Sequence, residues 1–278
     1  MIIGVMGKGG SGKSTVSTQL VESAHRLGSS VLGIDADHNM DLLFNLAPSA
    51  ENVPFLGQNR AVFDAGIDLQ SRETYARRLQ RGDLPTFSFS PPDALTSQLT
   101  FLVRERMRLM VAGPHTEEVK AGSVCSHVLA APLKVYLPCL DTHQNDVVVV
   151  DSTAGMDMVG SGIAVGMDLV YIVAEPTIHS TKTAKQIAEG LKWFNVPHAF
   201  VVNKVQRPEQ VDQAAQWLGE APMFVLSFTA DAQENETIFG EMIRYAEAFA
   251  RSSGGAAVRR ARAAQGIEDG VDQMAKNG

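Results

Sequence analysis

The chain has 278 residues, of which 45% are hydrophobic and 20% charged, a balance that suits one sizeable globular domain. The formal net charge of -7 argues against a general nucleic-acid-binding protein, so we expect no nucleic-acid partner. No run of 18 apolar residues occurs, so we expect no membrane-spanning segment. The arginine-containing tail has too few bulky apolar residues for a membrane-surface helix, so we expect no membrane partner. With only two cysteines in the sequence, the expected location is the cytoplasm.

A phosphate-binding loop is predicted at the start of the chain. The apolar residues 1–6 are followed by Gly-Lys-Gly-Gly-Ser-Gly-Lys-Ser-Thr, which fits Gly-x4-Gly-Lys-Ser/Thr between a strand and a helix predicted over 15–25. Glycines allow successive backbone N–H groups to turn toward a phosphate, and the following helix directs its positive end at the same point. We expect Lys13 on the β- and γ-phosphates and the Ser14 hydroxyl on Mg²⁺. The expected nucleotide-binding residues of the loop are Gly9, Gly10, Ser11, Gly12, Lys13, Ser14 and Thr15.

Buried strands of a parallel sheet are predicted further along the chain. Residues 30–35, 146–151, 169–174 and 200–203 are short and almost uniformly apolar, as expected when both faces of a sheet are covered. Helices at 180–193 and 238–250 and a late strand at 223–226 complete the alternation. This pattern predicts an α/β fold with a doubly wound, mostly parallel sheet, which binds ligands at the carboxyl ends of its strands.

Other segments are less regular. Residues 99–103 and 109–112 predict paired strands with a turn near Glu105. The stretch 47–92 is irregular apart from a helix near 71–80, whose Arg77, Arg78 and Arg81 are expected to form a solvated face. Residues 124–137 predict a helix with Pro132 near an end or a kink. We assign residues 1–250 to a single P-loop domain, and 251–278 to a flexible C-terminal tail.

Polar residues at strand ends supply the candidate chemistry. Asp151 ends the strand 146–151 and is expected to accept a hydrogen bond from Mg²⁺-bound water. Asp37 is our candidate for orienting the attacking water, and Asp35 is the alternative, which otherwise binds metal-coordinated water. Asn203 and Lys204 follow a strand, where a side-chain amide can read the edge of a purine. Asparagine also commonly ends strands, so both interpretations of Asn203 stay open.

Taken together, these motifs resemble the MinD/ParA-type ATPases with the deviant Walker A motif. The loop 8–15 resembles that motif, residues 35–39 and 151–155 resemble the two switch regions, and 203–204 resembles the adenine-reading element. The resemblance covers residues 1–249 and implies Mg²⁺-dependent hydrolysis of ATP by a homodimer that ATP closes. It also implies that Lys8 reaches the phosphates of the partner chain. Lys8, Lys13 and Asp37 are therefore the expected catalytic residues.

Several stretches are most similar to the CooC group, the ATPases that insert nickel into carbon monoxide dehydrogenase. They are residues 111–113, 122–127, 151–160, 175–177, 180–189 and 201–205. This similarity implies a maturation role, with a metalloenzyme such as nickel-containing carbon monoxide dehydrogenase as the client. The alternative for the whole chain is a MinD/ParA-like positioning or partitioning switch without a metal role.

The CooC group carries a Cys-x-Cys pair that binds nickel or zinc between subunits. Here Cys125 occupies the first position and His127 replaces the second cysteine. A two-fold axis would bring together two thiolates and two imidazoles, a tetrahedral set for Zn²⁺ that Ni²⁺ also accepts. The alternative is a structural cysteine beside an unrelated surface histidine. Cys139 is expected to pack against the sheet and His143 to lie in a surface turn.

Overall fold

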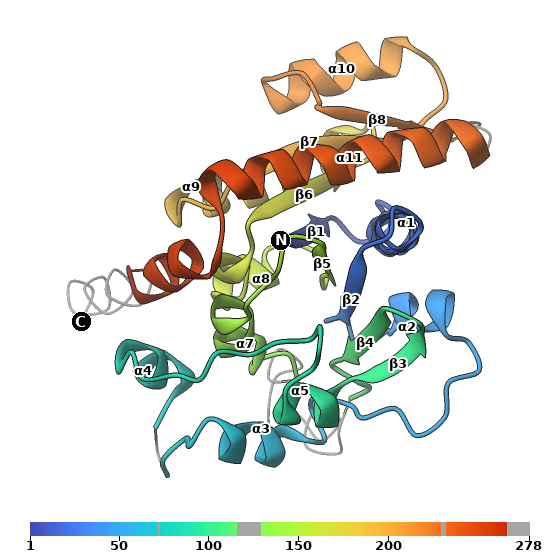
Figure 1. The fold of residues 1–278 in the computed structure, drawn as a ribbon. Coiled ribbons are helices and arrows are strands. Elements are labelled where there is room, and N and C mark those ends of the chain that lie inside the picture. Colours follow the sequence, from blue (N-terminus) through green and yellow to red (C-terminus); the bar gives the residue numbers. More distant parts are fainter. Residues whose placement is uncertain (72, 116–128, 229–231, 266–278) are drawn as a thin grey trace.

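An eight-stranded sheet forms the centre of the computed structural model, which describes residues 1–71, 73–115, 129–228 and 232–265 (Figure 1). The strands are β1 (Ile2–Gly7), β2 (Ser30–Asp35), β3 (Phe101–Arg104), β4 (Met107–Val111), β5 (Asp146–Asp151), β6 (Leu169–Ala174), β7 (His198–Val205) and β8 (Phe224–Ser227). Their order across the sheet is β3-β4-β2-β5-β1-β6-β7-β8. Neighbouring strands are parallel except at the β3–β4 edge, which is antiparallel. The predicted doubly wound α/β fold is confirmed.

Helices make most of the connections, because parallel strands need long crossovers. They are α1 (Lys13–Arg26), α2 (Asp41–Leu46), α3 (Arg60–Gly66), α4 (Tyr75–Gln80), α5 (Ala94–Leu99), α7 (Leu133–Cys139), α8 (Asp157–Gly160), α9 (Ile178–Trp193), α10 (Glu209–Leu218) and α11 (Ala232–Ser253). A 3-10 turn, η2 (Ala164–Gly166), precedes β6.

Each face of the sheet has its own hydrophobic core, because successive side chains of a strand point to opposite faces. Along β1, Ile3 and Val5 belong to the cluster formed with α1 and α11, whereas Ile2 and Met6 belong to the cluster formed with α7 and α9. Every residue of β1, β5 and β6 is buried. Coverage of both faces explains why these strands are uniformly apolar in sequence.

Several sequence-based boundaries needed correction. The helix predicted over 15–25 starts two residues earlier, at Lys13. The helix predicted over 124–137 is confirmed only as α7, for which Pro132 is the N-cap, while residues 116–128 lie outside the described ranges. The stretch 47–92, expected to hold one helix, contains both α3 and α4. The β3–β4 hairpin is confirmed.

Arg78 was expected to lie on a solvated face, and this prediction was wrong. Its side chain is buried against the loop that follows α3, where its Nε donates to the carbonyl oxygen of Ile67 at 2.8 Å. The same guanidinium forms an ion pair with Asp83. Burial of an arginine requires such partners, and their presence cannot be inferred from the local sequence.

The described part of the segment beyond residue 250 also differs from the flexible tail expected from its composition. α11 continues to Ser253, and residues 256–265 are helical. Arg259 on this last helical stretch is fully buried, and its Nη1 lies 2.8 and 2.9 Å from the two carboxylate oxygens of Asp168. A buried ion pair, in which one guanidinium nitrogen contacts both carboxylate oxygens, fixes the segment against the domain.

Two side chains outside the main site lie as expected. Cys139 is buried in the core beneath the sheet, and burial raises the pKa of its thiol. His143 is exposed in the turn before β5. In the described ranges, no helix has both the length and the apolar character required to span a bilayer.

Candidate nucleotide site

The predicted phosphate loop joins the carboxyl end of β1 to the amino end of α1. Gly7, Gly10 and Gly12 have φ values of 156°, 82° and 95°, a range that favours glycine. A side chain at Gly7 would overlap the carbonyl oxygen of Val173 on β6. The backbone therefore turns at these positions in a way that only glycine allows, as a loop that wraps a phosphate requires.

The two lysines of the loop lie in different environments. Lys13 is buried, and its Nζ donates to the carbonyl oxygen of Lys8 at 3.4 Å. Burial lowers the pKa of Lys13, while the nearby charges of Asp151, Asp37 and Asp41 oppose that shift. The side chain of Lys8, in contrast, is exposed. The structure thus places Lys13 among the carboxylates of its own chain, and Lys8 at the surface.

Asp151 ends β5 directly beside the loop. One of its carboxylate oxygens, Oδ1, accepts a hydrogen bond from the Ser17 hydroxyl of α1 at 2.9 Å. The other, Oδ2, is buried and has no hydrogen-bond partner in the described part of the chain. Burial raises the pKa of Asp151 to about 6, although the nearby hydroxyl groups of Ser14 and Ser17 and the charge of Lys13 lower it. Ser17 is a part of the site that the sequence motif did not reveal.

Asp35 lies in register with Asp151 on the adjacent strand β2. It is completely buried and accepts hydrogen bonds from the backbone N–H of Leu43 at 2.9 Å and of Asp37 at 3.3 Å. Burial, reinforced by the charge of Asp151, raises the pKa of Asp35 to about 8. The carboxylate therefore also fixes the first turn of α2, a structural task that the sequence did not predict.

These side chains fit a magnesium ion. Ser14, Asp35 and Asp151 offer only oxygen atoms, the ligand type that Mg²⁺ prefers. The unpartnered Oδ2 of Asp151 is an acceptor that a metal-bound water would satisfy. Burial is the main cause of the raised pKa values of both Asp35 and Asp151. The charge of Asp151 adds to the shift of Asp35, and the charge of Asp37 adds to that of Asp151.

Asp37 follows β2 and is half-buried. Its Oδ1 accepts a hydrogen bond from the backbone N–H of Asn39 at 3.0 Å and lies 3.4 Å from Nδ1 of His38. Its charge acts on the pKa of both Lys13 and Asp151, which places it close to the phosphate loop. The structure therefore brings Asp37 together with the other predicted residues of the site.

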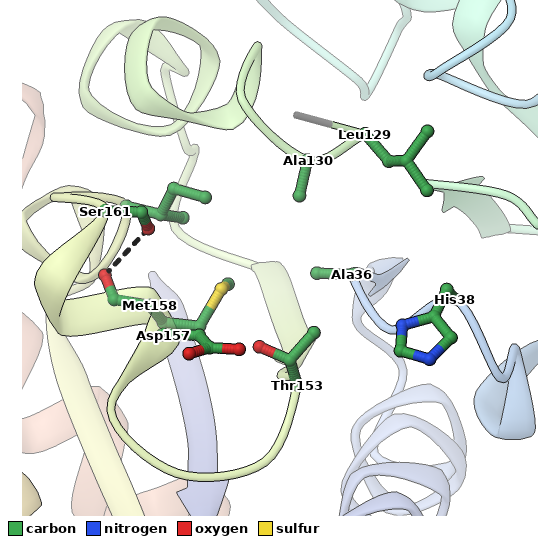
Figure 2. A pocket seen from close by; sticks show the side chains of 9 residues that line it. Ala36, His38, Leu129, Ala130, Thr153, Asp157, Met158 and Ser161 are labelled. Carbon is green, nitrogen blue, oxygen red and sulfur yellow. Dashed lines mark hydrogen bonds between the residues drawn. The ribbon is translucent and has the colours of Figure 1, made fainter. Parts of the chain in front are cut away.

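His38 also borders a small cavity between the segments that follow β2 and β5 (Figure 2). Thr153, Asp157 and Ser161 are among the residues on its other wall, and the space amounts to only about 10 Å³. The segment after β5 also contacts the loop, because the backbone N–H of Gly155 donates to the carbonyl oxygen of Gly7 at 2.9 Å. The two predicted switch regions thus meet beside the phosphate loop.

Asn203 and Lys204, at the carboxyl end of β7, hold the outer side of the loop. The Asn203 amide nitrogen donates to the carbonyl oxygen of Ser11 at 2.9 Å. The Lys204 Nζ donates to the carbonyl oxygen of Gly10 and to the carboxylate of Glu175, both at 2.6 Å. Both residues therefore reach the loop, and Glu175 joins them although it was not among the predicted site residues.

A larger cavity of about 580 Å³ opens beside the loop, between α1, the ends of β7 and β8, and α11. Its lining includes Gly12, Asn203, Phe228 and Phe239. An aromatic and apolar wall next to a phosphate loop suits a nucleotide base. Of the predicted site residues, Cys125 and His127 lie outside the described ranges. Across those ranges, no group of three or more His, Cys, Asp or Glu residues is arranged to hold a metal ion.

A doubly wound parallel sheet, a glycine-rich loop before α1 and buried carboxylates at neighbouring strand ends define a P-loop nucleotide-binding protein. The sequence matches the family model described as the CobQ/CobB/MinD/ParA nucleotide-binding domain over residues 2–255. The chain belongs to this family and is an ATPase of the MinD/ParA type.

Individual relatives agree with this assignment. The chain is 27% identical to an uncharacterised ATP-binding protein of Methanocaldococcus jannaschii over 212 residues, which are 74% of this chain and 79% of that protein. It is 29% identical to the carbon monoxide dehydrogenase accessory protein CooC of Rhodospirillum rubrum over 235 residues, 80% of this chain and 83% of CooC. Its fold resembles the cell division ATPase MinD of Pyrococcus furiosus, with a TM-score of 0.56, 19% identity, and coverage of 96% of this chain and 98% of MinD.

Proposed function

We propose that this ATPase is a nucleotide-dependent, dimerising maturation factor that handles a metal ion for a metalloenzyme client. The observation that carries the proposal is the similarity to CooC, which is 29% identical over 80% of this chain and 83% of CooC. A nickel enzyme of the carbon monoxide dehydrogenase kind is the proposed client.

Hydrolysis in this proposal depends on positioning and on stabilisation of charge. Lys13, buried among carboxylates, holds the β- and γ-phosphates, while Ser14, Asp151 and Asp35 hold Mg²⁺ directly or through water. When bound there, Mg²⁺ would neutralise negative charge on the phosphates. Asp37 accepts a hydrogen bond from the attacking water and so orients it. Its place near both Lys13 and Asp151 supports this role better than that of Asp35, whose carboxylate is bonded to the start of α2.

Lys8 is the residue on which the proposal of a dimer rests. Its side chain is exposed, whereas Lys13 is buried within its own site. A cation supplied by a second chain stabilises the transition state only when the two chains meet, which couples hydrolysis to dimerisation. By analogy with cations supplied in trans to other nucleotide sites, Lys8→Ala should lower turnover by about a thousandfold while nucleotide binding persists.

Sedimentation velocity with and without ATP tests the role of Lys8, with Lys182→Ala as a matched control because Lys182 is an exposed lysine on α9. We expect Lys8→Ala to stay monomeric with ATP under conditions in which wild type and Lys182→Ala dimerise. A Lys8→Ala protein that dimerises and hydrolyses ATP like wild type would contradict the proposal.

The proposed metal site consists of Cys125 and His127 from two chains, in a closed dimer. Two thiolates and two imidazoles would bind Zn²⁺ tetrahedrally, and Ni²⁺ accepts the same ligands. Elemental analysis of the purified protein with ATP should find about half a metal ion per chain, since a site on a two-fold axis is shared. Cys125→Ala and His127→Ala should each lose that metal, and unchanged stoichiometry in both variants would refute the site.

The same preparations test the rival function as a positioning or partitioning switch. Co-sedimentation with liposomes or with DNA in the presence of ATP should show no enrichment if the chain is a maturation factor. Strong ATP-dependent binding to either, without bound metal, would replace the proposal by the rival.

A further inference from the structure

Three residues outside the phosphate loop form a contact network on its outer side. The Lys204 ammonium bridges the Gly10 carbonyl oxygen and Glu175, with both distances at 2.6 Å. Asn203 binds the next carbonyl oxygen, that of Ser11, at 2.9 Å. Glu175 follows β6, whereas Asn203 and Lys204 belong to β7, so two neighbouring strand ends contact the loop.

The backbone at this point indicates that the contacts are specific. Lys204 has a φ of 60°, a left-handed conformation that is uncommon for a residue with a side chain and that persists where the surroundings hold it. The amide oxygen of Asn203 accepts the backbone N–H of Lys204 at 2.8 Å, which fixes the orientation of the amide. A side chain at Gly12 would overlap the Asn203 amide nitrogen, so the close approach also requires glycine in the loop.

Because of peptide geometry, these contacts also fix the direction of backbone N–H groups that can bind phosphate. In a planar trans peptide, the C=O and the following N–H point in opposite directions. Holding the Gly10 and Ser11 carbonyl oxygens on the outer side therefore turns the N–H groups of Ser11 and Gly12 toward the inner side of the loop. Those N–H groups are the donors that a phosphate loop offers to its ligand. In the structure the Ser11 N–H donates to the Lys8 carbonyl oxygen at a long 3.2 Å.

We propose that Glu175 and Lys204 are positioning residues for ATP binding, which hold two peptide groups of the phosphate loop in the orientation that nucleotide requires. Lys204 acts on the Gly10 carbonyl oxygen, and Glu175 keeps the Lys204 ammonium in place. Asn203 performs the same task one peptide further along. In this arrangement Lys204 acts on the phosphates through the loop backbone and not by direct contact with them.

Glu175→Gln distinguishes a positioning role of Lys204 from direct contact of Lys204 with the phosphates, because the two roles predict opposite changes in the Kd for Mg-ADP. If Lys204 bound the phosphates directly, Glu175→Gln would release the ammonium and remove a negative charge near an anionic ligand, so Mg-ADP would bind more tightly. Positioning predicts the opposite. We expect the Kd for Mg-ADP, measured by calorimetry, to rise about five- to tenfold, the scale of one weakened charge-assisted hydrogen bond.

The double variant and a matched control complete the test. In a Lys204→Met background, Glu175→Gln should change the Kd by less than about twofold, because the carboxylate then has no ammonium to hold. Glu175→Asp should restore part of the affinity. Glu189→Gln removes the same charge from an exposed position on α9 and should leave the Kd unchanged. In steady-state hydrolysis, Glu175→Gln should raise KM with little change in kcat.

Two outcomes would overturn the proposal. One is a Kd for Glu175→Gln that is unchanged or lower than that of wild type. The other is a full additional weakening by Glu175→Gln in the Lys204→Met background. If Lys204→Met fails to fold, the sign of the Glu175→Gln effect alone decides, because that variant changes only a half-buried carboxylate.

Discussion

Buried aspartates occur at both ends of the sheet, and they differ in the groups that compensate their negative charge. At the amino end, Asp168 accepts hydrogen bonds from the Ile2 and Gly255 backbone and forms an ion pair with Nη1 of Arg259, which contacts both of its oxygens. Burial by itself raises the pKa of Asp168, but the charge of Arg259 and these hydrogen bonds lower it overall. At the carboxyl end, burial raises the pKa of Asp35 to about 8 and that of Asp151 to about 6.

The difference distinguishes a structural carboxylate from one that awaits a ligand. The protein itself compensates the charge on Asp168, so this charge stabilises the fold. Asp35 and Asp151 face each other across adjacent strands, and within the described ranges Oδ2 of Asp151 has no partner. Their charges destabilise the ligand-free protein and are compensated when Mg²⁺ and nucleotide bind.

The largest effect on stability is expected at the amino end of the sheet, where Asp168 lies. Arg259→Met should lower the free energy of unfolding by about 3–5 kcal/mol, because it leaves the Asp168 charge buried without its cation. Urea denaturation measures the change, and Arg251→Met is the matched control, since Arg251 is exposed on α11. A loss below about 1 kcal/mol would show that the ion pair does not fix the C-terminal segment.

At the nucleotide end, removal of one buried charge should have the opposite effect on stability. Asp151→Asn keeps an acceptor for the Ser17 hydroxyl but removes a buried charge, so ligand-free stability at pH 8 should rise by about 1 kcal/mol. Turnover of ATP should fall by about a hundredfold. Loss of stability together with full activity would place Asp151 with the structural carboxylates.

The sequence predicted this site better than the contacts that support it. Asp151 and Asp35 were identified because each ends an apolar strand, and the glycine loop follows a fixed pattern. The partner of Asp168 is 91 residues away along the chain, so no local signal pairs it with Arg259. Arg78 is a similar case, because its burial depends on α3 and on Asp83. Likewise, Glu175 gains its role from the adjacency of β6 and β7.

A smaller effect is expected in the pH dependence of stability. Asp35 and Asp151 bind protons more tightly in the folded chain, so ligand-free stability should fall as pH rises from about 4, up to about 6 for Asp151 and up to about 8 for Asp35. The slope is at most about 1.4 kcal/mol per pH unit for each group within its window. Asp168 has a lowered pKa, so its contribution is present above about pH 4 and is lost as pH falls further.

Urea midpoints between pH 5 and pH 8, with and without saturating Mg-ADP, measure this dependence. Nucleotide should flatten the decline, because it stabilises the ionised carboxylates. The variant Asp35→Asn should flatten it in the absence of nucleotide. A ligand-free stability that rises steadily from pH 5 to pH 8 would contradict the raised pKa values.

The number of protons released on nucleotide binding tests most directly whether the buried carboxylates at the carboxyl end of the sheet await a ligand. Preformed Mg-ADP is titrated into the protein at pH 7 in buffers of different ionisation enthalpy, which yields the number of protons released. Because Asp35 has a pKa of about 8 and must ionise beside bound Mg²⁺, we expect about one proton per chain, and almost none from Asp35→Asn. Binding of Mg-ADP to the wild-type protein without proton release would contradict the account.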